Sequence, residues 1–220
     1  SIGILTALLE REQSGRGQWV QTSLLESMIG MLDFQAARWL INQEIPEQAG
    51  NDHPTSIPTG VFPTSDGHIN IAGAGAQQMW ERLCKAVGAE HLLAREEYKT
   101  GKLRSTHRVA LNQELSAITQ QDSTAEWIKR FEKASVACGP IYRMDQVFDD
   151  PQTQHLGIAV PVQHPELGDI KVVGQPVGLS RTPSEIRTAT PARGEQTDDV
   201  MLELGYSAAE IMDLKARLVI

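Results

Sequence analysis

The chain has 220 residues, 40% of them hydrophobic, and a formal net charge of −8 at pH 7 without a cluster of lysines and arginines. This charge argues against a nucleic-acid partner and against an anionic membrane surface, and no apolar run reaches the ~20 residues that span a bilayer. Cys84 and Cys138 are too few and too far apart for a disulfide framework, so we expect a cytoplasmic protein with one core or two small ones.

The first 56 residues predict a helix, a short β-type run, a second helix and a loop. Apolar residues recur at helical spacing over 2–9, and the glycine-containing segment 14–17 permits a tight reversal after the helix. A β-type run over 18–23 then precedes a buried amphipathic helix over 24–41. No period persists from 42 to 60, and a loop of this length favours a binding role or a crossing between domains.

Residues 57–175 predict a small α+β domain. Ser65-Asp66-Gly67 between two apolar runs is typical of a β-hairpin, and a second hairpin is predicted between Ile158 and Val173. Helices are predicted between the hairpins over 77–87, over about 106–119 and from a capping box at Ser123–Glu126.

Residues 176–220 predict an extended connector and two terminal helices. Thr197 is expected to cap the first helix, with Asp198 and Asp199 favourable at the positive end of its dipole. A capping box over 207–210 begins the second helix. The apolar residues of both helices need a surface to cover, and the sequence offers no obvious one.

Several segments, taken in chain order, resemble the family III coenzyme A transferases. This is the formyl-CoA transferase and carnitine-CoA transferase type, to which α-methylacyl-CoA racemase is related. The resemblance runs from residue 2 to 220 and corresponds to the C-terminal half of the family's chain. The segments that carry it are Gly3–Arg11, Ser14–Gln18, Ser23–Ser27, Asn51–Pro54, Phe62–Gly67, Val136–Pro140, Asp150–Gln152, Gly194–Asp198 and Leu204–Tyr206.

The resemblance implies a fold and a domain organisation. Residues 57–175 would form a small α+β domain of antiparallel hairpins with helices. Residues 1–56 and 176–220 would belong to a Rossmann-like large domain that is mostly absent from these 220 residues. Two complete chains would form an interlocked homodimer.

The resemblance also implies the reaction, in which coenzyme A moves between carboxylic acids through an aspartyl mixed anhydride. The substrates would be an acyl-CoA and a carboxylic acid, and no tightly bound cofactor is expected. The family's aspartate precedes the first helix, so we assign no catalytic residue here and expect these residues alone to be inactive. Two alternatives stay open: a racemase-like member, and a non-catalytic module that binds acyl-CoA or a partner.

The loop before the first hairpin is the candidate substrate-binding segment. By the resemblance, Asn51, His53, Thr59 and Gly60 would approach the acyl group. The alternative for His53 is a structural histidine packed beside the following proline. Some members of the family have a mobile glycine-rich segment at this place, which Thr55–Gly60 does not match. The histidines lack metal-ligand spacing, so we expect no metal site. Asp52 is the carboxylate whose role the sequence leaves most open.

Overall fold

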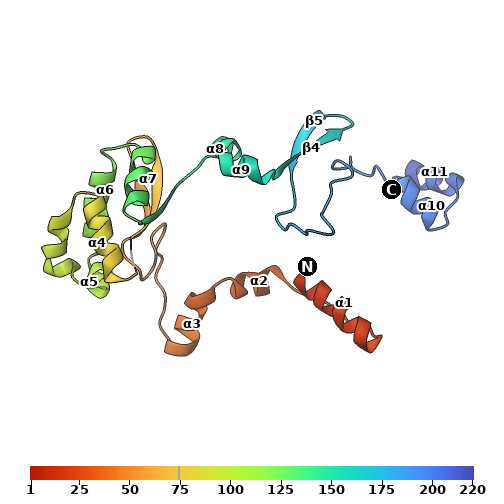
Figure 1. Cartoon of the computed structure of the whole chain (residues 1–220). Helices are drawn as coiled ribbons and strands as arrows, with labels where there is room; N and C mark the ends of the chain where they lie inside the picture. Colours follow the sequence, from red (N-terminus) through yellow and green to blue (C-terminus); the bar gives the residue numbers. More distant parts are fainter. Residues whose placement is uncertain (74) are drawn as a thin grey trace. The chain divides into compact units, whose positions relative to one another are not determined.

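The computed structural model describes residues 1–73 and 75–220 (Figure 1). It contains helices and small antiparallel sheets, which confirms the expected α+β class. The chain forms two compact units, Ser1–Ile141 and Tyr142–Ile220. The domain boundaries at residues 57 and 175 stay predictions.

The N-terminal helices differ in part from expectation. Helix α1 (Ile2–Ser14) ends as predicted at Gly15, which adopts a left-handed conformation with φ 71°. The prediction of one helix over 24–41 is wrong, because α2 (Leu24–Gly30) and α3 (Asp33–Asn42) are separate. Gly30 has low helix propensity and Asp33 has a positive φ of 45°, so the backbone turns between them.

Two further expectations for this region are also wrong. Residues 18–23 form no strand, since no neighbouring strand pairs with them among the described residues. The helices are not buried within this chain, and α1, α2 and α3 contain no buried residue. Their exposed apolar side chains include Leu24 and Met31.

A three-stranded antiparallel sheet organises the core of the first unit. It has the order β1 (Thr59–Pro63), β2 (His68–Ala72), β3 (Ala137–Pro140). Phe62 pairs with Ile69 and Ile71 with Cys138, and the strand alternation turns Phe62, Ile69 and Ile71 inward. The predicted hairpin around Asp66 is confirmed.

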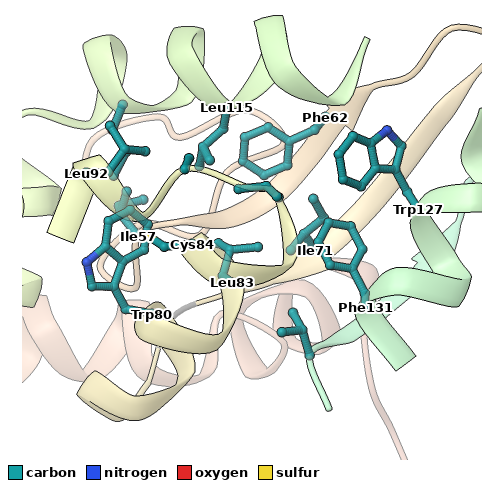
Figure 2. Close-up of a cluster of buried hydrophobic side chains, with 14 of the residues drawn as sticks. Ile57, Phe62, Ile71, Trp80, Leu83, Cys84, Leu92, Leu115, Trp127 and Phe131 are labelled. Carbon is teal, nitrogen blue, oxygen red and sulfur yellow. The ribbon is translucent and has the colours of Figure 1, made fainter. Parts of the chain in front are cut away.

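Helices pack against this sheet around a continuous apolar cluster (Figure 2). They are α4 (Gln77–Ala86), α6 (Arg108–Thr119) and α7 (Thr124–Lys133), with 3-10 turns at Glu90–Ala94 and Glu96–Tyr98. Helix α5 (Gly101–Thr106) lies beside α6 and the second of these turns. Trp80, Leu115, Trp127 and Phe131 are almost completely buried there. Burial of each such side chain stabilises the fold by about 1.5–3 kcal/mol.

Polar contacts fix α6 and α7 to the first hairpin. Trp127 Nε1 donates to the carbonyl oxygen of Thr119 at 2.7 Å, and Thr119 Oγ1 donates to the carbonyl oxygen of Pro63 at 2.7 Å. The predicted capping box is confirmed in part: Ser123 Oγ accepts from the amide of Glu126, whereas the Glu126 carboxylate pairs with Lys129. These bonds satisfy buried polar groups at the end of α6.

The second unit contains two helical pairs and a hairpin. Its elements are α8 (Met144–Asp149), α9 (Pro151–Leu156), β4 (Ala159–His164), β5 (Gly168–Val173), α10 (Thr197–Glu203) and α11 (Ala208–Ala216). The hairpin of β4 and β5 and the capping box of Ser207 and Glu210 are as predicted. The expectation that Thr197 caps α10 is wrong: Gln196 is the N-cap, because its carbonyl oxygen accepts the first helical hydrogen bond, from the amide of Val200.

No helix in the described part of the chain has the length and apolar character needed to cross a membrane.

Candidate functional site

The candidate site is the segment 51–60, called the site loop below, which leads into β1. The amide of His53 donates to the carbonyl oxygen of Thr59 at 2.7 Å, and Asp52 forms an antiparallel bridge with Gly60. The two ends of the site loop therefore lie side by side. The structure brings His53, Thr59 and Gly60 together, and Asn51 is exposed next to them.

The His53 ring is held from two sides. Its Nδ1 accepts hydrogen bonds from the amides of Ser56 at 2.9 Å and Thr55 at 3.2 Å, so in the neutral ring the proton is on Nε2. The ring is stacked on Phe34 of α3, with centroids 5.9 Å apart and an angle of 4° between the planes. His53 thus has a structural role in the loop and presents Nε2–H as a donor.

Asp52 is also engaged within the loop. Its Oδ2 accepts from Asn112 Nδ2 of α6 at 2.9 Å, and a Cβ atom on Gly60 would lie 2.5 Å from its Oδ1. Glycine at position 60 lets the backbone of β1 approach this carboxylate. These contacts give the Asp52 carboxylate a structural role, because it connects the site loop to α6 and lies against the backbone of Gly60.

A polar hollow of about 600 Å³ adjoins the site loop within the first unit. Its lining includes Pro54 and Thr55 of the loop together with Arg38, Glu44 and Arg108. Arg38 pairs with Glu44, and this hydrogen bond holds the pKa of the Glu44 carboxyl below its ordinary value. A lining of this kind suits a polar or ionised ligand more than a long hydrocarbon chain.

The sequence analysis did not identify three side chains of α5 and α6 that reach the loop, namely Arg104, Arg108 and Asn112. Arg108 and Asn112 are four residues apart on α6 and so share one helix face, which is a signal that could have grouped these two. Arg104 lies on the separate helix α5 and is not marked by this spacing. Arg104 is buried at 2% exposure, which is unusual for arginine.

The Cys84 thiol and the possible metal ligands do not form a second candidate site among the described residues. Burial raises the pKa of the Cys84 thiol to about 12, so it is protonated and inert near neutral pH. Within the described residues, no group of three or more His, Cys, Asp or Glu side chains could hold a metal ion.

The comparison with known families agrees with the resemblance of the sequence segments. The model of the family described as CoA-transferase family III matches residues 1–197. The chain belongs to this family.

Relatives and solved structures extend the comparison. Succinyl-CoA:glutarate CoA-transferase of Homo sapiens is 32% identical over 201 residues, which cover 91% of this chain and 46% of that protein. Formyl-CoA:oxalate CoA-transferase of Shigella sonnei is 28% identical over 97% of this chain and 56% of that protein. A CAIB/BAIF family protein from Brucella suis superposes with a TM-score of 0.75 at 28% identity, over 92% of this chain and 52% of that chain. The chain spans about half the length of the curated relatives it matches.

Proposed function

We propose that the complete protein transfers coenzyme A from an acyl-CoA to a carboxylic acid. Membership of CoA-transferase family III over residues 1–197 is the observation that carries the proposal. The acids named for relatives are glutarate, D-citramalate, mesaconate and oxalate, and each has two carboxyl groups. A dicarboxylic acceptor is therefore the proposed substrate class.

The proposed chemistry proceeds through an aspartyl mixed anhydride. An enzyme carboxylate attacks the thioester carbon and expels the CoA thiolate, which then attacks the aspartyl carbonyl and releases the donor acid. The acceptor carboxylate attacks the resulting aspartyl thioester and expels the CoA thiolate, which leaves a second mixed anhydride. The thiolate then attacks the acceptor's acyl carbon in this anhydride, which gives the acceptor's CoA thioester and frees the enzyme carboxylate. Because water would destroy each acyl intermediate, the site must exclude water and hold the reacting groups in attack geometry.

The site loop is proposed to contribute to the acid-binding wall of this site. Asn51 and His53 Nε2 would offer donors, and the backbone around Thr59 and Gly60 would approach the acyl group. The close pairing of Asp52 with Gly60 supports a loop whose backbone is already ordered. We assign no catalytic residue among these 220 residues and propose that alone they do not transfer coenzyme A.

The proposed assembly is an interlocked, cytoplasmic homodimer of the complete protein. Residues 1–56 and 176–220 would complete a large domain, with 57–175 as the small domain. Exposed apolar side chains on α1, α2 and α3 support an extensive contact surface there. Acyl-CoA is proposed as substrate, without a tightly bound cofactor.

The test is His53→Ala in the complete protein. We expect the KM for the acceptor acid to rise about tenfold, equivalent to ~1.4 kcal/mol of binding, with a smaller change in kcat. His91→Ala, at an exposed position in the 3-10 turn Glu90–Ala94, is the control and should leave both constants unchanged. A lower melting temperature with unchanged kinetics would restrict His53 to its structural role.

A further inference from the structure

Three side chains at intervals of four residues contact the site loop in reverse order along the chain. Arg104 Nε donates to the carbonyl oxygen of Ile57 at 3.1 Å, and Arg108 Nη2 donates to the carbonyl oxygen of Pro54 at 2.6 Å. Asn112 Nδ2 donates to Asp52 Oδ2 at 2.9 Å. We call Arg104, Arg108 and Asn112 the clasp.

Arg104 is the most buried member of the clasp. Its Nη1 donates to the carbonyl oxygen of Tyr98 at 2.9 Å and to Gln77 Oε1 at 3.3 Å, and the guanidinium lies 5.1 Å from the Trp80 ring centroid. In the described part of the chain it has no ion pair with a carboxylate. A buried cation is costly unless hydrogen bonds compensate it, and these bonds go mainly to backbone carbonyls. Arg104 therefore fixes backbone positions, including the middle of the site loop.

Asn112 is oriented by the loop carboxylate. Its Oδ1 is buried and has no hydrogen-bond partner among the residues that the structure describes. Rotating the amide would turn this oxygen toward Asp52, where two acceptors would repel each other. The observed orientation gives up one acceptor and keeps the bond to Asp52.

Arg108 connects the middle of the clasp to the loop backbone. Pro54 has no amide hydrogen, so its backbone can form a hydrogen bond only through the carbonyl oxygen. Arg108 donates to this oxygen. The neighbouring residues Thr55 and Ser56 donate their amides to His53 Nδ1. The clasp and the His53 ring thus hold adjacent peptide groups of one turn.

We propose that Arg104, Arg108 and Asn112 are positioning residues, which hold the site loop as a fixed wall of the acid-binding site rather than as a mobile lid. The role of this wall in substrate binding rests on the proposed function. The clasp itself rests on hydrogen bonds and burial, so the two can be tested separately.

The first measurement is hydrogen exchange on the 220-residue chain. Asn112→Ala and Arg108→Ala should speed exchange of the His53 amide at least tenfold, because the Asp52 and Pro54 anchors are lost. Arg108→Lys should restore part of the protection, since lysine can still donate to the Pro54 carbonyl. Gln113→Ala, on the same helix at an exposed position, is the control and should leave exchange unchanged. Unchanged exchange of His53 in both alanine variants would overturn the clasp.

The second measurement is transfer kinetics of the complete protein with the Asn112→Ala change. A fixed wall predicts a rise of about tenfold in the KM for the acceptor acid, a smaller change in kcat and no effect of Gln113→Ala. Faster loop exchange with unchanged KM would overturn the positioning role. If the unmodified complete protein transfers no coenzyme A, the proposed function fails while the exchange result still decides whether the clasp holds the loop.

Discussion

Gly60 and Asp52 approach so closely that a Cβ atom at position 60 would collide with the Asp52 carboxylate. A Cβ atom there would lie 2.5 Å from Asp52 Oδ1 and 3.1 Å from the carbonyl oxygen of Asn51. Gly60→Ala should destabilise the first unit by about 1–3 kcal/mol, because the loop must move away from β1. Chemical denaturation of both variants measures this loss.

Gly139→Ala is the matched control for this change. Gly139 lies in β3 of the same sheet, and a Cβ atom there would meet nothing within 4 Å. Its stability should stay close to that of the unmodified chain. Equal stability of the two alanine variants would contradict the close approach of Gly60 to Asp52.

Asp66 should make stability depend on acidic pH. Its Oδ1 accepts from the backbone amide of Thr124 at 2.8 Å, which is the main reason why the pKa of this carboxyl lies below its ordinary value of 3.8. A carboxyl with a lowered folded pKa stabilises the fold above its unfolded pKa, and this contribution is lost as the pH falls through the folded pKa. Asp66→Ala should therefore lower the melting temperature at pH 7 and have a smaller effect below pH 3.8.

Asp66→Asn separates the charge from the hydrogen bond. The amide oxygen can still accept from Thr124, whereas the contribution of position 66 to stability should no longer change with pH in the acidic range. A melting-temperature difference between Asp66→Ala and the unmodified chain that is the same at pH 3 and pH 7 would exclude the proposed linkage.

A comparison of two buried tryptophans measures how much the indole hydrogen bond of Trp127 contributes to stability. Trp127 Nε1 donates to Thr119, whereas Trp80 Nε1 is buried and has no partner among the described residues. Both rings are stacked with an arginine, Arg130 over Trp127 and Arg104 over Trp80. Trp127→Phe should therefore destabilise the chain more than Trp80→Phe, by about 1–2 kcal/mol in denaturant titrations. A larger loss for Trp80→Phe would show that packing differences outweigh the hydrogen bond.

Local patterns predicted the elements of the fold that depend on nearby residues. The Asp66 hairpin and the Ser123 cap follow from turn and capping chemistry within a few residues. The single helix over 24–41 was wrong because its apolar period masked the break between Gly30 and Asp33. Its expected burial also failed, since periodicity marks an apolar face without saying whether the same chain covers it.

The site was harder to read because its contacts join distant segments. The resemblance singled out residues of the loop, but no local pattern linked Asp52 to Asn112 or Ile57 to Arg104. A single buried arginine that donates to backbone carbonyls, such as Arg104, changes neither the composition nor the hydrophobic periodicity of the sequence, so its burial could not be predicted from them. Such contacts emerge only once the helix of Arg108 and Asn112 is packed beside the loop.

The most direct test of the account is product analysis of the complete protein with succinyl-CoA and a second dicarboxylic acid such as glutarate. Coenzyme A transfer predicts that the acceptor's CoA thioester and free succinate form in equal amounts, with little free coenzyme A. A chiral α-methylacyl-CoA, supplied in a parallel reaction, should keep its configuration. Racemisation without transfer, hydrolysis alone, or no turnover with any dicarboxylic acid would contradict the proposed function.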